Sequence, residues 1–195
     1  MFQWISIIGF SVVFAGLFLH HLIFPCGYKP RFTAGSLIRK KVHLLTLLFP
    51  EQKLNWPTKF RKLVFVLGLF SFCVLLATGF GPLLCGCRLH GYLLMIHATF
   101  APVFIGCAAI VAILGAGQYC FNKKDAGTKA GFWVLLALSL PVTLTMVLSM
   151  FPLFGTHGQE ILLDAHRWSA LIFALIAIIE LYMLIRMEVL KDTER

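Results

Sequence analysis

Residues 89–121 read LHGYLLMIHATFAPVFIGCAAIVAILGAGQYCF and contain no Asp, Glu, Lys or Arg. A helix that crosses the hydrocarbon core of a bilayer needs about 20 predominantly apolar residues. The stretch therefore predicts a transmembrane helix that protrudes beyond the bilayer or tilts within it. Four further runs satisfy the same length requirement, and they are Phe2–Phe24, Leu63–Leu84, Ala130–Phe154 and Ile161–Leu190.

The composition of the 195-residue chain agrees with this pattern. Hydrophobic residues make up 59% of the chain and charged residues 13%, against about 25% charged residues in soluble domains. This balance excludes a disordered chain, a nucleic-acid-binding arm and a small secreted module. The first run has no positive segment before it and no small-residue cleavage site before Pro25, so we expect a retained helix. The predicted fold class is an all-α membrane protein with five transmembrane helices.

The net charge of +9 is a topology signal, because the basic residues lie between the apolar runs. They gather in residues 25–62, in residues 122–129 and in the C-terminal tail. The opposite side carries only Arg88 and Arg167. The positive-inside rule makes the basic side cytoplasmic. We therefore expect the N-terminus outside and the C-terminus in the cytoplasm.

The seven histidines are the strongest functional signal. Ionisable groups at membrane depth are expensive and usually functional. At a rise of about 1.5 Å per residue, His97 lies ~10 Å below His90, and His166 reaches a comparable depth if its helix begins near Gln159. Two histidines at one depth on two helices predict the axial ligands of a bis-histidine haem. A histidine that is hydrogen-bonded across helices is the alternative for either residue alone.

The residues around His97 and His166 suit a broad, flat cofactor. Arg88 and Arg167 are the candidates for neutralising haem propionates, and His90 is an alternative ligand. Small residues near the two histidines leave room for a ring, and they are Gly79, Gly81, Ala98, Ala101, Gly106, Ala165, Ser169 and Ala170.

Three segments resemble the b-type cytochrome membrane subunits of bacterial respiratory complexes, such as formate dehydrogenase, nickel–iron hydrogenase and thiosulfate reductase. The resemblance covers roughly residues 60–190. It implies a four-helix haem-binding bundle over residues 63–195, with residues 1–62 as an added transmembrane helix and basic cytoplasmic loop, in the bacterial cytoplasmic (inner) membrane. The segments are Arg61–Phe65 with Ser71-Phe72 and Thr78-Gly79, then His97–Phe100, and finally Leu163–Ala170.

The departures from the family pattern fall in the inner half of the bundle. Members with two haems carry a second histidine about fourteen residues along each ligand helix, where this chain has Val111 and Glu180. A histidine near the start of the opening helix is replaced around Val64. The resemblance thus implies one haem b near the outer face. A second haem would take a ligand from His20 or His21.

The resemblance implies electron transfer between the quinone pool and an outer redox subunit, either a multihaem cytochrome c or an iron–sulfur protein, with other membrane subunits at the sides of the chain. His157, Glu160 and Asp164 are the candidates for a quinone site, because such sites need protonatable groups at the mouth of an apolar slot. A wet loop before the last helix is the alternative for these three. Glu180, in an apolar helix, either handles a proton or quinone on the inner side or bonds to a neighbouring helix.

The chain contains no glycine-rich phosphate loop, HExxH motif or nucleophile elbow. We therefore expect a non-catalytic subunit of an oxidoreductase complex instead of a stand-alone enzyme. The rival hypotheses are a haem-free structural anchor and a small proton-linked transporter. Cys85 and Cys87 flank Gly86 and are either two separate loop cysteines or a pair that binds a metal or a partner.

Overall fold

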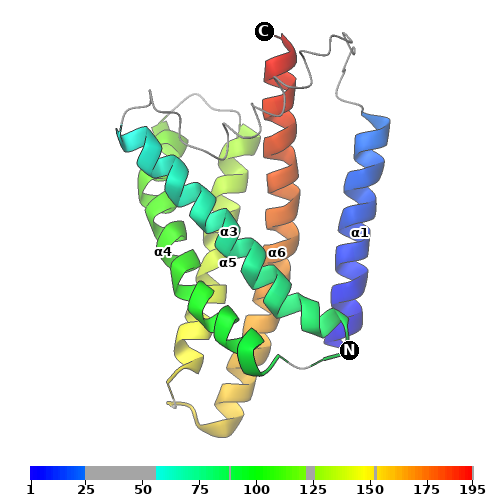
Figure 1. Cartoon of the computed structure of the whole chain (residues 1–195), viewed down its shortest axis with the longest axis vertical. Helices are drawn as coiled ribbons and strands as arrows, with labels where there is room; N and C mark the ends of the chain where they lie inside the picture. Colours follow the sequence, from blue (N-terminus) through cyan, green and yellow to red (C-terminus); the bar gives the residue numbers. More distant parts are fainter. Residues whose placement is uncertain (25–55, 88, 122–125, 152, 195) are drawn as a thin grey trace. The chain divides into compact units, whose positions relative to one another are not determined.

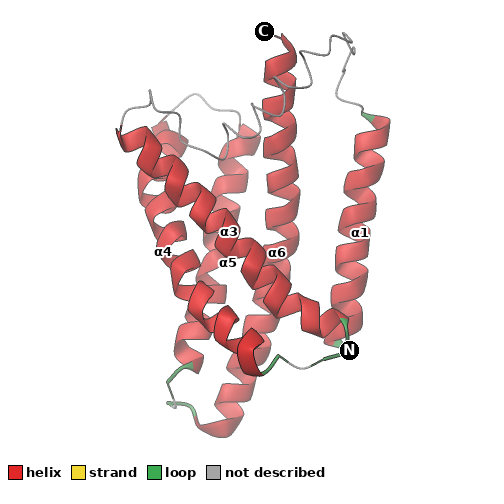
Figure 2. Ribbon diagram, viewed as in Figure 1, coloured by secondary structure: helices red, strands yellow, loops and turns green. Residues whose placement is uncertain are grey.

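The computed structural model describes residues 1–24, 56–87, 89–121, 126–151 and 153–194. Over those ranges every regular element is a helix and no strand occurs (Figures 1 and 2). The predicted all-α fold with five long helices is confirmed for this part of the chain. The helices are α1 (Phe2–Ile23), α3 (Trp56–Leu84), α4 (Gly91–Phe121), α5 (Ala126–Ser149) and α6 (Gly155–Glu194).

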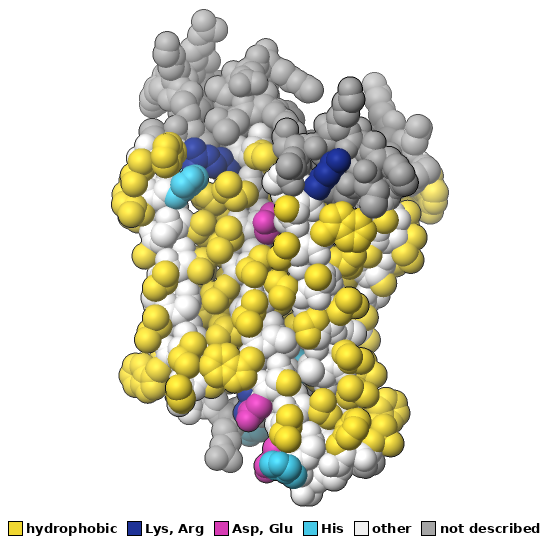
Figure 3. Space-filling model, turned by 180° about the vertical axis from the view of Figure 1, so that it is seen from behind, with side chains coloured by type: hydrophobic (Ala, Val, Ile, Leu, Met, Phe, Trp, Pro, Cys, Tyr) yellow, Lys and Arg dark blue, Asp and Glu magenta, His cyan; other side chains and the backbone are white. Residues whose placement is uncertain are grey.

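Each of these helices is long and apolar enough to cross a membrane. Large hydrophobic side chains that are more than half exposed occur along them, including Phe18 and Ile113. Hydrophobic side chains cover most of the face seen in Figure 3. Such a surface is stable next to lipid, and the chain is a multi-pass membrane protein. The spans are Phe2–Ile23, Lys59–Leu84, Gly91–Ala116, Lys129–Ser149 and Gly155–Met187.

The start of α6 differs from the prediction. The helix begins at Gly155 and not near Gln159, because Gly155 adopts a left-handed φ of 65° that reverses the chain. The amide of Gln159 then donates to the carbonyl oxygen of Phe151 at 2.6 Å. This bond ties the second turn of α6 to the start of the preceding loop.

The helices form two compact units. One unit contains α1, α5 and α6, and the other contains α3 and α4. The sequence predicts a boundary at residue 62, between an added N-terminal segment and a four-helix bundle. The two compact units are defined by contacts and do not test that boundary, which stays a prediction.

Helices α3 and α4 form an antiparallel hairpin with a narrow seam. Gly68 lies so close to α4 that an added Cβ would meet the Cβ of Cys107 at 3.2 Å. Further along, Thr78 contacts His97. Small residues at a contact between membrane helices let the backbones approach closely and strengthen their packing. The seam therefore holds His97 against α3.

Gly86 closes this hairpin. It follows α3 with a φ of 73°, and its N–H donates to the carbonyl oxygen of Leu83 at 3.1 Å. The N–H of Cys87 donates to the carbonyl oxygen of Pro82 at 2.8 Å. These bonds satisfy the last carbonyls of the helix in the manner of a left-handed C-terminal cap.

In the other unit, α6 packs against both α5 and α1. Helix α5 runs antiparallel to α6, so Gly131 lies at the level of Glu180 and Val142 lies at the level of His166.

Helix α1 runs parallel to α6. Phe2 stacks edge-on against Trp168 with ring centroids 4.9 Å apart, and His20 bonds Tyr182 near the other end. Contacts near both ends of α1 fix its register on α6.

We expect the Gly68→Leu variant to destabilise the α3–α4 hairpin by about 1–3 kcal/mol, the usual cost of overpacking a tight contact. The measurement is thermal unfolding of the detergent-solubilised protein. Gly106→Leu is the matched control, because an added Cβ at Gly106 meets nothing within 4 Å. Equal destabilisation by both variants would contradict the close contact at Gly68.

Candidate functional site: two oriented histidines

His97 lies half-buried near the start of α4. Its Nδ1 atom is 2.9 Å from the hydroxyl oxygen of Thr78 on α3. The same hydroxyl lies 2.7 Å from the carbonyl oxygen of Val74. Thr78 is itself buried, with 7% of its surface exposed. The imidazole is therefore held by a side chain whose own position is fixed within α3.

The Thr78 hydroxyl determines which nitrogen of His97 carries the proton. Two oxygen atoms 2.7 Å apart need a proton between them, so Thr78 donates its only hydroxyl proton to Val74. The Thr78 oxygen is then an acceptor toward His97, and Nδ1 of His97 is the donor. In the neutral ring, Nε2 then carries the lone pair. A neutral imidazole of this tautomer can bind a metal ion through Nε2.

Gly79 makes room for the imidazole. A Cβ at this position would lie 3.1 Å from Cε1 of His97. That distance is tighter than ordinary van der Waals contact, so any side chain at position 79 would push the ring away from Thr78. The Thr78-Gly79 pair thus supplies both the hydrogen-bond acceptor and the space.

His166 lies half-buried on α6 and faces α5. Its Nδ1 atom is 3.1 Å from the backbone carbonyl oxygen of Val142. The hydroxyl of Thr145 is 3.4 Å from the same nitrogen and donates to the carbonyl of Pro141 at 2.6 Å. A carbonyl oxygen can only accept, so Nδ1 of His166 is the donor. The lone pair of the neutral ring is again on Nε2.

The two histidines share one local design, although they belong to different units. Each lies on the second helix of a hairpin and donates Nδ1–H to an oxygen on the first helix. Thr78 precedes the end of α3 by six residues, and Val142 precedes the end of α5 by seven. Histidines that ligate metals almost always donate their other ring nitrogen to a carboxylate, carbonyl or water.

The observed start of α6 changes the predicted depth of His166 in its helix. The predicted depth depends on a helix that begins near Gln159, but α6 begins at Gly155. His166 is therefore eleven residues into its helix, or about 16 Å, whereas His97 is six residues into α4, or about 9 Å. The premise that the two histidines are equally far into their helices is therefore wrong, and their equal depth in the membrane stays a prediction.

Arg167, a predicted propionate partner, is bound within its own helix. Its Nη1 atom lies 2.9 Å from Oδ1 of Asp164, and both side chains are largely exposed. A surface pair of this kind is worth little, about 0–1 kcal/mol. Arg167 can therefore exchange Asp164 for another anion at small cost. Arg88, the other predicted propionate partner, lies outside the described residues.

The predicted quinone residues His157, Glu160 and Asp164 are exposed along the first part of α6. Their spacing of three and four residues places them on one face of the helix. At 100° per residue this face is about 120–180° around the axis from His166. The three residues are thus together, but on a side of α6 away from the side that carries His166.

His90 and His21, two of the alternative ligands, are both exposed. His20 has an arrangement opposite to that of the two candidate ligands. The guanidinium of Arg186 donates to Nδ1 of His20 at 2.9 Å, so this nitrogen must be the acceptor and Nε2 carries the proton. The arrangement does not favour His20 as a haem ligand.

Glu180 lies half-buried on α6 against α5. Its carboxyl group occupies the space that a side chain at Gly131 would fill. The absence of a side chain at Gly131 explains why a carboxyl group fits between α5 and α6 at this level. Among the described residues, no contact of Glu180 indicates a path for protons or a site for quinone.

Cys85 and Cys87 are both exposed free thiols. Within the described ranges no group of three or more His, Cys, Asp or Glu residues is arranged to hold a metal ion.

Sequence reasoning missed the groups that orient the histidines. The sequence indicates Thr78 only as part of a motif, and the carbonyl of Val142 has no sequence signal at all. One signal was available, because a threonine precedes each histidine by 19 or 21 residues across a short loop. The Tyr182 and Arg186 contacts of His20 were also missed.

No family model, curated protein or solved structure matches the chain.

The structure predicts the tautomers of three histidines. In the haem-free protein above pH 8, His97 and His166 should be protonated on Nδ1, and His20 on Nε2. Solid-state NMR of protein labelled with ¹⁵N-histidine separates the two nitrogens by chemical shift, and single His→Ala variants assign the signals. His20 is the internal control because its predicted tautomer is the opposite one. An Nε2-protonated His97 or His166 would contradict the assignment for that residue.

Proposed function

We propose that the protein is a membrane-embedded b-type cytochrome subunit in which His97 and His166 supply the axial ligands of one haem. The complex would be a respiratory one in the bacterial cytoplasmic membrane, with the haem near the outer face and the N-terminus outside. The observation that carries the proposal is that each histidine donates Nδ1–H to an oxygen on a neighbouring helix.

This orientation prepares an imidazole for iron. The Nδ1 bonds to Thr78 and Val142 leave the lone pair on Nε2 and restrict rotation of the ring. They also increase the basicity of the ligating nitrogen. A histidine that only links two helices through Nδ1 would have the same tautomer, so the amount of bound haem is the measurement that separates the two functions.

The surroundings of the histidines also suit a ring system. Gly79 leaves no side chain beside His97, and Ala165, Ser169 and Ala170 flank His166 with small side chains. The hydroxyl of Ser169 is bonded to the carbonyl of Ala165 at 2.8 Å, so it presents no unsatisfied donor to an apolar ring. Arg167 directly follows His166 in the sequence, and its guanidinium would neutralise a haem propionate.

A bound haem would supply one-electron chemistry, because its iron alternates between ferric and ferrous states. The protein residues have three tasks: to hold the iron, to exclude water with apolar helices, and to set the potential through the Nδ1 bonds. The electron partners would be a quinone of the bilayer and an outer multihaem cytochrome c or iron–sulfur subunit. His157 and Glu160 are exposed protonatable groups for the quinone reaction.

A haem-free anchor and a proton-linked transporter are the rival functions. An anchor would keep the same hydrogen bonds between helices but would bind no haem. A transporter needs a polar path through the helices, whereas the buried residues on α6 are Leu171, Phe173 and Ala174. Both rivals predict a chain without haem when it is expressed with its partners and ample haem.

His97→Ala and His166→Ala should each reduce bound haem to a few per cent of wild type or less, because iron would lose an axial ligand. Haem per polypeptide is measured by pyridine haemochrome assay, and the reduced-minus-oxidised spectrum reports bis-histidine ligation. His157→Ala is the matched control, since His157 is exposed on the same helix as His166. Full haem in both ligand variants would show that the assignment is wrong.

Thr78→Val should lower haem affinity roughly 10–100-fold, the usual effect of removing a hydrogen bond to a ligating histidine. Valine has nearly the same shape as threonine but cannot accept the Nδ1–H bond. The measurement is the rate and extent of haem transfer to a scavenging apoprotein. Thr78→Ser should restore binding, and an unchanged affinity in Thr78→Val would remove this residue from the site.

A further inference from the structure

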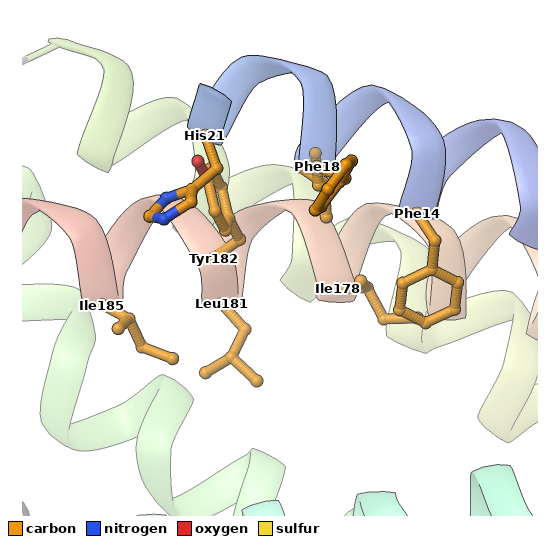
Figure 4. Close-up of a pocket in the computed structure, with 8 residues that line it drawn as sticks. Phe14, Phe18, His21, Ile178, Leu181, Tyr182 and Ile185 are labelled. Carbon is orange, nitrogen blue, oxygen red and sulfur yellow. The ribbon is translucent and has the colours of Figure 1, made fainter. Parts of the chain in front are cut away.

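An open groove runs between α1 and α6. Its volume is about 570 Å³, and its walls are apolar except for His21 and Tyr182 at one end. Figure 4 shows His21 beside Tyr182 at that end and Phe14 beside Ile178 at the other. The apolar walls are formed by Phe14, Leu17 and Phe18 of α1 and by Ile178, Leu181 and Ile185 of α6.

A positively charged cluster adjoins the polar end of the groove. The guanidinium of Arg186 donates to Nδ1 of His20 at 2.9 Å and to the hydroxyl of Tyr182 at 3.4 Å. Its Cζ atom lies 5.9 Å from the centre of the Phe24 ring. These contacts hold the charge beside the groove.

The charge of Arg186 has no anionic partner among the described side chains, where the recorded ion pair is Arg167 with Asp164. The contacts of Arg186 are to a neutral phenol, an imidazole and an aromatic ring. The side chain is also half-buried. A partly desolvated guanidinium is stabilised when a phosphate or carboxylate accepts from its remaining N–H groups.

The cluster is at the depth of lipid headgroups. The span of α1 ends at Ile23 and that of α6 ends at Met187, and the two helices run in parallel. His20, Tyr182 and Arg186 therefore lie at the end of both spans. From there the groove extends about 10 Å, or seven residues, toward the middle of the membrane. Its apolar residues Phe14 and Phe18 are more than half exposed.

We infer that this groove binds one phospholipid with an anionic headgroup. The headgroup phosphate accepts hydrogen bonds from Arg186, and His21 lies at the same end of the groove. An acyl chain lies along Phe18, Leu181 and Ile178. The inference is independent of the haem proposal, because neither His97 nor His166 takes part in it.

The charge distribution favours an anionic lipid over a neutral isoprenoid quinone. A quinone carbonyl requires a donor but no net charge, whereas Arg186 brings a full positive charge without a counterion. A protein partner covering the same face would need an acidic residue at this depth. These alternatives are tested as competing outcomes.

The experiment uses native mass spectrometry of the purified full chain, titrated with phosphatidylglycerol or with phosphatidylcholine of the same acyl chains. We expect about fivefold tighter binding of phosphatidylglycerol, corresponding to about 1 kcal/mol for one basic residue at the membrane surface. Arg186→Gln should bring the ratio close to one, and Arg186→Lys should retain most of it. Arg167→Gln, on the same helix and at its other end, should leave the ratio unchanged.

Groove variants separate this site from a general attraction between charges. Leu181→Trp and Ile178→Trp fill the groove and should weaken both lipids several-fold while leaving their ratio unchanged. Helical circular dichroism and elution volume verify that each variant is folded. The inference is overturned if the wild-type chain binds both lipids equally, or if Arg186→Gln keeps the preference. Displacement of phosphatidylglycerol by an equimolar isoprenoid quinone also overturns it.

Discussion

An imidazole inside a bilayer has no water to bond, and the remaining features of the two candidate ligands follow from this constraint. Each ring must find its hydrogen-bond partner within the protein, because an unsatisfied polar group in hydrocarbon costs several kcal/mol. In both hairpins that partner is an oxygen on the adjacent helix, from Thr78 in one and Val142 in the other. Donation of Nδ1–H to that oxygen stabilises the tautomer in which Nε2 carries the lone pair. A structural requirement of the membrane thus produces an arrangement suited to a metal.

The fold could be predicted from the sequence because a membrane span is a property of a single segment. Length, apolar content and the absence of charge predict the five described helices, with ends that differ from the observed ones by up to seven residues. The start of α6 was misplaced because it depends on the left-handed φ of Gly155 and on the bond from Gln159 to Phe151. Both features are local details of a turn and leave the hydropathy pattern unchanged.

The candidate site was predictable only in part, for a related reason. The chemistry of His97 and His166 is visible in their residue type and their position in apolar runs. Their partners are not visible, because a backbone carbonyl such as that of Val142 exists at every position. Contact across helices selects this one, and sequence spacing does not encode it. The same limit applies to His20, a predicted alternative ligand, because its contact with Arg186 arises from the packing of α1 against α6.

The three histidines show that the partner, and not the residue type, determines what an imidazole can do. An acceptor at Nδ1, as at His97 and His166, leaves the lone pair of the neutral ring on Nε2, the nitrogen through which the proposed haem iron would be bound. A donor at Nδ1, as at His20, places the lone pair on Nδ1, where it accepts the hydrogen bond from Arg186. The ring is then part of a cluster that carries the positive charge of Arg186. A cation at the end of two spans is stabilised by an anion in the headgroup layer. The first arrangement therefore favours a prosthetic group within the helices, and the second favours a ligand from the lipid around them.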